Sequence, residues 1–576
     1  MSALADPGGD GSRGAPFNSL QALEQASQAG DDLVVLPVSL DVLPLDGGIA
    51  LKPHQRLLGG GPDVVQHPDN AAVAGAAVLN ALPRIRNTNL LRLEGDAVRL
   101  AEASEVRNLV ITESARGGIY GLNVPGASVH GNDLSGYNTT CTVGFTVEPF
   151  VLPTNAPLIG VPIALPAGWA GIMIDADRGT GAVKVTGNHV HNSACGNGID
   201  LRINGSADYV ATVSGNLVTQ LERGPLYQAG EFLVHAITLQ ITDHGRLAAT
   251  SINNTQTFIG AEGADCEGLF MNLSDSAIGT WSIDRNYFAH GIGGFSCNGM
   301  ELVISNGSTR AEMILRNSYF EDNPGDMLEQ LNFGVASTVI LEIENVVVKD
   351  THERGGDPDA SGTPGNRGIP GNLGDCLVTG STGSGNITRL KISNSEFSGC
   401  NNGLSLLSGI NVLNNVLGGV TSGSLSPNLV APDGLLQAEI SNSVFRDNAN
   451  SNVVVAVLAP LRELSLKVES SDFSRAGSST VLLRKPATGS VEQSRIDFGG
   501  AELGSAGGNC ILGGMPFDVR SEGFSAGMRG NWWGQAGGPN PERISQSEPG
   551  SLDLAAPLGT APVICSPRRS RAQVRS

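Results

Sequence analysis

Four charged residues form the best candidate for chemistry in this sequence. They occur in two short segments, GIMIDADRG and GIDLR, and they are Asp175, Asp177, Asp200 and Arg202. Acids beside an arginine could perform acid–base chemistry on a bound substrate. Aligning the two segments, however, places Asp175 directly beside Arg202, and an ion pair between neighbouring strands explains that arrangement more simply. The catalytic and the structural interpretation both remain open at this point.

A glycosidase would need two carboxylates at a defined separation of about 5–9.5 Å. Asp200 and Glu301 occupy the same outward column when the strand-like segments of the chain are aligned. They are three strands apart, which at the usual spacing of neighbouring strands is roughly 14 Å. This pair is therefore too widely separated to act together on one glycosidic bond.

One segment imitates the beginning of a calcium-binding loop. DPDASG places Asp357, Asp359 and Ser361 at alternate positions, followed by glycine at the sixth. The twelfth position is Gly368 instead of glutamate, and Pro358 is unfavourable in such a loop. The calcium motif is therefore incomplete, and Asp357 and Asp359 are its candidate ligands. No CxxC or Cys/His spacing typical of zinc occurs, so no other metal or cofactor is expected.

The charged residues belong to a strand that recurs along the chain. The segments GIMID, GIDLR, AITLQ, GLFMN and GMELV align, and their equivalent apolar residues are Ile172, Ile199, Ile237, Leu269 and Met300. Alternation of inward apolar and outward residues is typical of β-strands. We therefore expect these apolar side chains to form one buried column, with Asp200 and its neighbours facing outward.

A second repeat marks the turns between strands. Phrases such as VTGNHV, VSGNLV, ISNSEF and ISNSVF recur along the chain, and most successive copies are 21 to 37 residues apart. Their asparagines are Asn188, Asn216, Asn286, Asn317, Asn345, Asn394, Asn415 and Asn442. Asparagine tolerates left-handed backbone geometry and can hydrogen-bond along a stack of turns. Recurrence at this spacing predicts an all-β solenoid of stacked parallel strands.

The eight cysteines allow several disulfides. Cys266 and Cys297 each lie two residues before the glycine of an aligned strand, so they would stack roughly 4.8 Å apart, within reach of a disulfide. The other candidate pairs are Cys376 with Cys400 and Cys510 with Cys565. Ladders of small buried thiols are the alternative. Disulfides would favour an oxidising compartment.

Charge and hydropathy exclude some partners. The net charge of −20 argues against nucleic acid, which needs a basic surface. No run of 18 apolar residues occurs, so no transmembrane helix is expected. The first residues lack the features of a signal peptide. We nevertheless expect an extracellular or cell-surface protein whose leader is absent from this sequence.

Both ends of the chain resemble a known family. The helix-like segment PFNSLQALEQASQAG, followed by DGGIALKPHQRLLGGG, resembles the entry of bacterial right-handed parallel β-helix proteins of the pectate-lyase-like superfamily. The segment GNWWGQAGGP resembles the closure of NosD-like and polymorphic outer-membrane-protein-like repeats. The resemblance implies one right-handed parallel β-helix with a helical cap and a closure containing tryptophan.

These features suggest boundaries along the chain. We expect a disordered N-terminus at 1–15, a cap with the first strands at 16–83, the β-helix at 84–540 and a tail at 541–576. Residues 148–168 and 351–375 are expected to be loops, because they are rich in proline or glycine.

Function is less constrained than fold. The catalytic patterns of polygalacturonases, pectate lyases and alginate epimerases are not found in matching repeats. The first hypothesis is therefore a non-catalytic protein that binds or presents, with a polysaccharide or a surface protein as partner. The alternative is a polysaccharide lyase or glycoside hydrolase that uses the outward acids, with 148–168 as a wall. The sequence leaves the oligomeric state open.

Overall fold

The computed structural model describes most of the chain. The described residues are 1–60, 82–150, 163–221, 234–260, 266–291, 297–323, 325–349, 374–381, 384–408, 433–457, 460–485 and 490–565. The incomplete calcium motif with Asp357 and Asp359 lies outside these residues, as does the repeat at Asn415.

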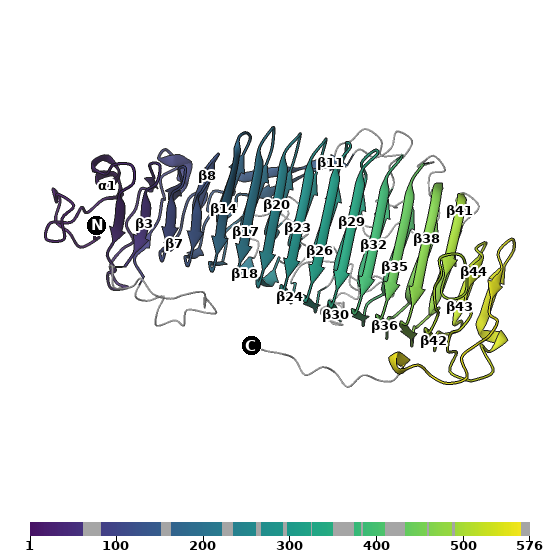
Figure 1. Ribbon diagram of the computed structural model, residues 1–576. Coiled ribbons are helices and arrows are strands. Elements are labelled where there is room, and N and C mark those ends of the chain that lie inside the picture. Colours follow the sequence, from purple (N-terminus) through teal and green to yellow (C-terminus); the bar gives the residue numbers. More distant parts are fainter. Residues whose placement is uncertain are drawn as a thin grey trace, which may run out of the picture. The chain divides into compact units, whose positions relative to one another are not determined.

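The fold consists of three long sheets in which paired strands run parallel, and each turn of the chain adds one strand to each sheet (Figure 1). This architecture is a parallel β-helix, and it confirms the all-β solenoid predicted from the repeats. A short α-helix, α1 (Leu20–Ala26), precedes the strands, and its N-cap is Ser19.

The first sheet has 16 strands and the second has 13 among the described residues. The strands of the first sheet are β1 (Asp32–Val35), β3 (Arg56–Gly59), β6 (Glu105–Arg107), β9 (Ser128–His130), β14 (Thr180–Thr186), β17 (Asp208–Ser214), β20 (Arg246–Ile252), β23 (Ile278–Asp284), β26 (Arg310–Arg316), β29 (Thr338–Glu344), β32 (Ile387–Ser393), β35 (Leu435–Ser441), β38 (Leu461–Glu469), β41 (Val491–Asp497), β44 (Ala526–Gly527) and β46 (Leu552–Asp553). The strands of the second sheet are β4 (Arg84–Ile85), β7 (Val110–Thr112), β10 (Asp133–Ser135), β15 (His189–His191), β18 (Leu217–Leu221), β21 (Thr255–Ile259), β24 (Tyr287–Ala289), β27 (Tyr319–Glu321), β30 (Val347–Lys349), β33 (Glu396–Ser398), β36 (Val444–Arg446), β39 (Asp472–Ser474) and β42 (Cys510–Leu512).

The third sheet has 15 described strands and carries the candidate site. Its strands are β2 (Ile49–Ala50), β5 (Val98–Arg99), β8 (Ile119–Leu122), β13 (Ile172–Ala176), β16 (Ile199–Ile203), β19 (Val234–Ile241), β22 (Cys266–Leu273), β25 (Cys297–Ile304), β28 (Leu328–Asn332), β31 (Leu377–Ser381), β34 (Asn402–Ser408), β37 (Ser451–Val457), β40 (Val481–Arg484), β43 (Val519–Glu522) and β45 (Ile544–Ser547). A small antiparallel sheet pairs β11 (Val143–Phe150) with β12 (Ile163–Gly168), so both ends of the expected loop at 148–168 are strand.

The predicted core column is present. Ile199 pairs with Ile237, and Ile237 pairs with Leu269 in the next strand. All three side chains are buried. The alternation of apolar and polar residues therefore predicted the register of the third sheet correctly, because a slip of one residue would have turned the whole column outward.

A ladder of buried asparagines lines one turn. The backbone N–H of Asn188 donates to Oδ1 of Asn216 at 3.0 Å, and that of Asn216 donates to Oδ1 of Asn254 at 3.0 Å. Asn254 in turn donates to Oδ1 of Asn286 at 2.8 Å. Each side chain thus satisfies backbone groups in the turn, as buried polar groups require.

The asparagines aligned from the sequence occupy two different positions in the turns. The alignment that treated them as equivalent is therefore wrong by one residue for some of them. Asn317, Asn345, Asn394 and Asn442 have positive φ angles between 48° and 55°. They precede the ladder position, which in that part of the chain is often serine: the N–H of Ser395 donates to Oγ of Ser443. Where the ladder residue is asparagine, glycine often supplies the left-handed geometry one residue earlier, as at Gly187 and Gly215.

The N-terminal residues are placed, although the sequence suggested disorder for 1–15. The ammonium nitrogen of Met1 donates to the carbonyl of Val34 at 2.8 Å, and the N–H of Leu36 donates to the carbonyl of Met1 at 2.8 Å. These bonds occupy the free edge of β1. An open edge exposes unpaired backbone groups, so covering it stabilises the first turn.

The C-terminal end also extends beyond the expected boundary at residue 540. Trp533 is buried, and Trp532 forms a parallel bridge with Cys510. The strands β45 and β46 then pair with β43 and β44. The strand-pairing pattern therefore continues into the region expected to be a tail.

Four disulfides join described residues. Three of them link the pairs named from the sequence, with Cα–Cα distances of 4.3 Å for Cys266–Cys297, 5.4 Å for Cys376–Cys400 and 5.7 Å for Cys510–Cys565. The fourth, Cys141–Cys195, was not anticipated. No free cysteine occurs among the described residues.

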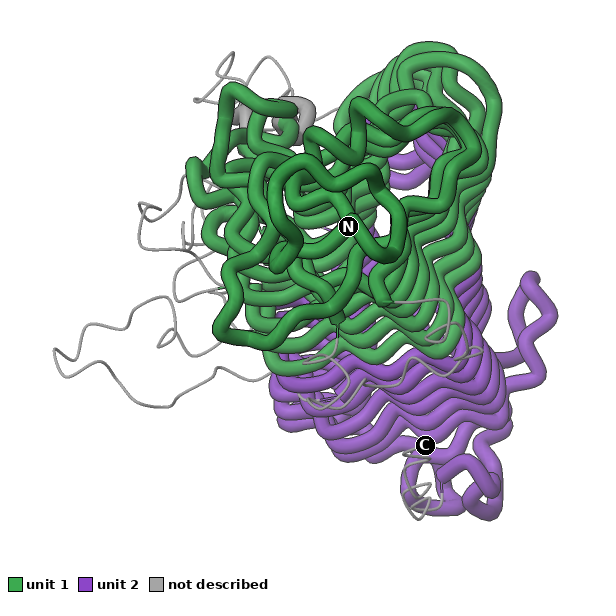
Figure 2. The backbone as a smooth tube through the Cα atoms, turned by 90° about the vertical axis from the view of Figure 1, so that its left-hand side faces the viewer, with its two compact units in different colours: residues 1–150, 162–311 green, residues 151–161, 312–576 purple. Residues whose placement is uncertain are grey.

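The chain divides into two compact units (Figure 2). Unit 1 comprises 1–150 and 162–311, and unit 2 comprises 151–161 and 312–576. Within the described residues, no helix has the length and apolar character needed to cross a membrane.

Candidate functional site

The candidate site lies in unit 1, on the outer face of the third sheet. The hairpin of β11 and β12 provides neighbours for this face. Nη1 of Arg202 donates to the carbonyl of Gly144 at 2.8 Å, and the Arg202 guanidinium lies 5.4 Å from the centre of the Phe145 ring. The Phe145 ring is in turn 6.1 Å from the ring of His235. These contacts come from Gly144 and Phe145, just before the segment 148–168 that was expected to form a wall.

The structure brings two of the four predicted residues into contact. Asp175 pairs with Arg202 in the register of β13 and β16, and Oδ1 of Asp175 is 3.5 Å from Nε of Arg202. The hydroxyl of Tyr120 donates to Oδ2 of Asp175 at 3.3 Å. Burial raises the pKa of Asp175 despite the nearby arginine, and burial together with Asp175 raises the pKa of Tyr120 to about 12.

Asp177 does not belong to this group. It is exposed just beyond the end of β13, where Asn123 donates to it at 2.8 Å and Arg178 lies 3.5 Å away. The sequence placed it with the others because it follows Asp175 at alternate spacing. The strand ends between them, so they do not share one surface.

Asp200 is fully buried although it points to the outer face. Nδ2 of Asn197 lies 3.3 Å from Oδ1 and 3.2 Å from Oδ2 of Asp200. Removal from water raises the pKa of Asp200 to about 6, although a hydrogen bond from Thr238 and the nearby His235 oppose the shift. A carboxyl group with this pKa can exchange a proton near neutral pH.

A buried imidazole–carboxylate pair lies beside Asp200. Nε2 of His235 is 2.7 Å from Oε2 of Glu267, and both side chains are almost completely buried, with exposed fractions of 0% and 2%. Nδ1 of His235 lies 3.2 Å from Oγ1 of Thr238. Thr238 therefore lies between His235 and Asp200, whose pKa it helps to lower. The four side chains form one buried polar cluster.

Sequence reasoning missed His235 and Glu267. They occupy paired positions in β19 and β22, immediately before the aligned segments AITLQ and GLFMN. Extending that alignment by a single residue would have revealed them. The Phe270 ring packs 4.3 Å from the His235 ring and helps to exclude water from the pair.

The spacing argument about Asp200 and Glu301 holds in the structure. Asp200 pairs with Thr238, Thr238 with Phe270 and Phe270 with Glu301. Three strand spacings separate the two acids, roughly 14 Å at the usual interval. They do not form a pair of glycosidase carboxylates.

A partly exposed aromatic patch borders the buried cluster. We define it as Tyr120, Trp169, Arg99 and Arg116. The guanidinium of Arg116 lies 3.9 Å from the centre of the Trp169 ring, and that of Arg99 lies 5.3 Å from the Tyr120 ring. Trp169 and Arg116 are mostly buried, whereas Tyr120 and Arg99 keep part of their surface exposed. Such guanidinium–ring contacts stabilise the patch.

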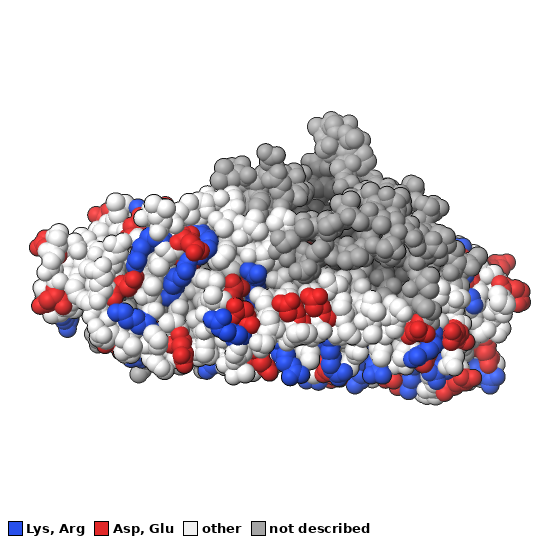
Figure 3. Space-filling model, turned by 90° about the horizontal axis from the view of Figure 1, so that it is seen from above, with Lys and Arg blue, Asp and Glu red and all other residues white. Residues whose placement is uncertain are grey.

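The charges of the patch are balanced. Arg116 pairs with Asp96 at 2.7 Å, and Arg99 pairs with Asp96 at 2.9 Å and with Glu94 at 3.2 Å. On the face seen in Figure 3, basic and acidic side chains are likewise interspersed among the described residues. The carboxylates of Asp96 and Glu94 therefore balance the guanidinium groups of the aromatic patch, which does not favour a highly charged ligand.

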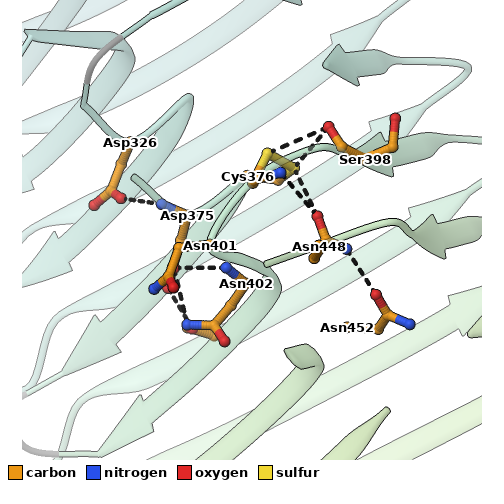
Figure 4. Close-up of a disulfide and its surroundings, with 10 residues drawn as sticks. Asp326, Asp375, Cys376, Ser398, Asn401, Asn402, Asn448 and Asn452 are labelled. Atoms are coloured by element: carbon orange, nitrogen blue, oxygen red, sulfur yellow. Dashed lines mark hydrogen bonds between the residues drawn. A yellow bond between two sulfur atoms is a disulfide. The ribbon is translucent and has the colours of Figure 1, made fainter. Parts of the chain in front are cut away.

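Unit 2 contains a separate cluster of buried acids (Figure 4). Oδ1 of Asp326 accepts from the N–H of Asp375 at 2.5 Å, and Asp375 itself accepts from Asn401, Asn402 and Ser405. Burial raises the pKa of both aspartates, and for Asp326 the neighbouring charges of Glu329 and Asp375 raise it further. Close carboxyl groups of this kind retain a proton.

Stability should therefore depend on pH through Asp326. A raised carboxyl pKa in the folded state contributes stability at low pH, and this contribution is lost as the pH rises through the folded pKa. Replacing Asp326 by asparagine keeps an oxygen to accept from Asp375 and removes the charge. We expect D326N to be more stable than the wild type at pH 8, on the order of 1–3 kcal/mol, with a smaller difference at pH 4.

Urea unfolding of D326N and wild type between pH 4 and pH 8 measures this effect. The exposed Glu439, on β35, supplies a control: E439Q removes a carboxylate outside the cluster, and its stability relative to wild type should not vary with pH. Equal pH profiles for D326N and wild type would contradict the raised pKa of Asp326.

No protein-family model, curated protein or solved structure matches the chain. The functional argument therefore rests on the residues of this site alone.

Proposed function

We propose that this protein binds a glycan chain on the outer face of the third sheet, beside the β11–β12 hairpin, without cleaving it. The observation that carries the proposal is the contrast between two neighbouring groups. The acid–base residues Asp200, His235 and Glu267 are buried in one cluster, whereas Tyr120 and Arg99 are partly exposed. Catalytic residues must be exposed enough for substrate to reach them, and this buried cluster is not. Residues that only stabilise the sheet can be buried.

The aromatic patch suits a neutral sugar. Binding sites for small ligands combine aromatic surface with a few fixed polar groups. Tyr120 provides a ring with a polar edge, and Arg99 with Glu94 provides planar donors and acceptors beside it. The balance of guanidinium and carboxylate charges favours an uncharged polysaccharide over a uronic acid polymer.

A location outside the cytoplasm fits this function. Four disulfides are typical of proteins that fold in an oxidising compartment. The resemblance of the chain ends to right-handed β-helix proteins of the pectate-lyase-like superfamily, with NosD-like or polymorphic outer-membrane-protein-like repeats, supports an extracellular or surface-displayed protein. We propose membership of that superfamily on the same grounds.

Retention on immobilised polysaccharides tests the proposal. We expect wild-type protein to bind at least one neutral polysaccharide of a panel, and Y120A to bind it about tenfold more weakly, equivalent to about 1.4 kcal/mol. The control F258A removes an exposed aromatic side chain from the second sheet and should bind as wild type does. Circular dichroism verifies that both variants are folded. Unchanged binding of Y120A would contradict the proposed site.

The alternative is a polysaccharide lyase or glycoside hydrolase. It is favoured by the pKa of about 6 at Asp200, because a general acid needs a proton near neutral pH. Incubation of the same polysaccharides with protein, with and without calcium, would reveal new reducing ends or unsaturated products. Cleavage that D200N abolishes would replace the binding proposal with the enzymatic one.

A further inference from the structure

A second polar cluster lies on the outer face of the second sheet in unit 1. His189 and His191 occupy alternate positions of β15, and the buried Val190 lies between them. Residues two apart in a strand point to the same side, so both imidazoles face outward. Asp133, in the neighbouring strand β10, pairs directly with His189. All three side chains therefore meet on one face.

The two imidazoles converge on the same carboxylate. Nδ1 of His189 lies 2.9 Å from Oδ2 of Asp133, and Nε2 of His191 lies 3.2 Å from Oδ1. The imidazole rings are stacked, with centres 4.1 Å apart. One ligand atom from each residue lies within 4.8 Å of the others, and among the described residues no other group of three acids, histidines or cysteines does so.

We propose that Asp133, His189 and His191 bind a divalent transition-metal ion of the zinc class. Two imidazole nitrogens and one carboxylate oxygen are a ligand set that Zn²⁺, Co²⁺, Ni²⁺ and Cu²⁺ accept. Three protein ligands leave at least one coordination position for water or a ligand. A hydrogen-bonded triad without metal is the competing explanation, and the experiment below separates the two.

Access and support for the ligands favour the metal site. His189 and His191 are partly exposed, with side-chain fractions of 31% and 17%, so an ion can reach them from solvent. Nδ1 of His191 lies 2.7 Å from the side-chain amide nitrogen of Asn192. The two ends of an amide group can be exchanged. With its oxygen turned toward Nδ1, Asn192 would accept a hydrogen bond from the Nδ1–H group, which leaves the lone pair of Nε2 free for the metal.

The repeat itself creates this site. Asp133 follows the buried Asn132, as His189 follows the ladder residue Asn188, and the side chain of Asn132 donates to Asn188 at 3.1 Å. Fixed turns on both strands hold the three ligands in register. This preorganised site is on the second sheet, whereas the proposed glycan surface is on the third. The metal-site proposal therefore does not depend on glycan binding.

Metal binding can be measured on the full chain without an affinity tag. We expect one Zn²⁺ per chain by equilibrium dialysis, and Co²⁺ should give visible absorption bands of a low-coordinate site. The double variant H189A/H191A should lose both signals, and D133N should bind at least about tenfold more weakly, as even losing a supporting residue does. D133N nearly preserves the side-chain volume, so it still tests metal binding if the double variant fails to fold.

His130 supplies the matched control. It contacts Glu105 at 2.9 Å on the first sheet, so H130Q removes a surface histidine from another histidine–carboxylate pair. H130Q should bind Zn²⁺ and Co²⁺ as wild type does. Undiminished Zn²⁺ binding by D133N and the folded double variant would overturn the proposal, as would the absence of stoichiometric Zn²⁺ or Co²⁺ binding by wild type.

Discussion

Replacing Glu267 by alanine is expected to destabilise unit 1 by about 3–5 kcal/mol, the usual cost of removing one partner of a buried imidazole–carboxylate pair. The substitution removes the partner of Nε2 of His235, which lies 2.7 Å away and is shielded from water. The imidazole would then remain in the interior without this carboxylate beside it. Loss of packing beside Phe270 adds to the effect.

The conservative variant E267Q separates charge from volume. Glutamine fills the same space and keeps an oxygen opposite His235, so we expect a smaller loss than for E267A. Urea unfolding monitored by circular dichroism measures both. E439A, at an exposed position of β35, should change the free energy of unfolding by no more than about 0.5 kcal/mol.

This prediction also bears on function. If His235 and Glu267 serve stability, E267A lowers the free energy of unfolding while the remaining folded protein still binds glycan. If they serve catalysis, E267Q abolishes polysaccharide cleavage with little loss of stability. An E267A variant as stable as wild type would contradict the structural role assigned here.

The fold was predictable because its signals are local and repeated. Ile199, Ile237 and Leu269 follow a period of two within each strand, and the same phrase recurs in the next turn. A parallel stack pairs equivalent residues, so alignment of the sequence with itself gives the register. For the same reason Asp175 and Arg202 could be paired before the structure was known.

The turns were harder to interpret, because two adjacent positions both favour asparagine. Asn216 lies in the buried ladder, whereas Asn394 has a φ of 53° and precedes the ladder position. A shift of one residue separates them, and the residue type is the same. Only the backbone conformation distinguishes an asparagine chosen for left-handed geometry from one chosen for its hydrogen bonds.

The buried His235–Glu267 pair and the proposed metal site could not be recognised from residue type alone, because each is formed by residues from different turns. His235 and Glu267 precede the apolar segments used for alignment, and Asp133 is 56 residues before His189. Cys141 and Cys195 are 54 residues apart, with the β11–β12 hairpin between them. This insertion interrupts the repeat between Asp133 and His189 and between Cys141 and Cys195, so the regular interval could not connect these two pairs.

Replacing Asn216 by alanine is expected to produce the other large effect. The side chain accepts from the N–H and Nδ2 of Asn188 at 3.0 and 3.1 Å, and it donates to Val185 and Asn254 at 2.9 and 3.0 Å. Four hydrogen bonds at about 1 kcal/mol each give a loss on the order of 4 kcal/mol, with buried partners left unsatisfied.

Hydrogen exchange of the amides near Asn188 measures this loss directly. Opening of the turn should become roughly a thousandfold more frequent in N216A, since about 1.4 kcal/mol corresponds to a factor of ten. N216S should lose less, because Ser443 shows that serine can occupy the ladder position elsewhere in the chain. N253G provides the control. Asn253 has a φ of 54°, and the equivalent positions of two earlier turns are Gly187 and Gly215. Glycine therefore suits this position, and hydrogen exchange should hardly change. A ladder that stabilises the solenoid requires N216A to open this turn far more than N253G does, because N216A removes four hydrogen bonds of a buried side chain, whereas N253G removes one exposed hydrogen bond, donated by Nε of Arg285.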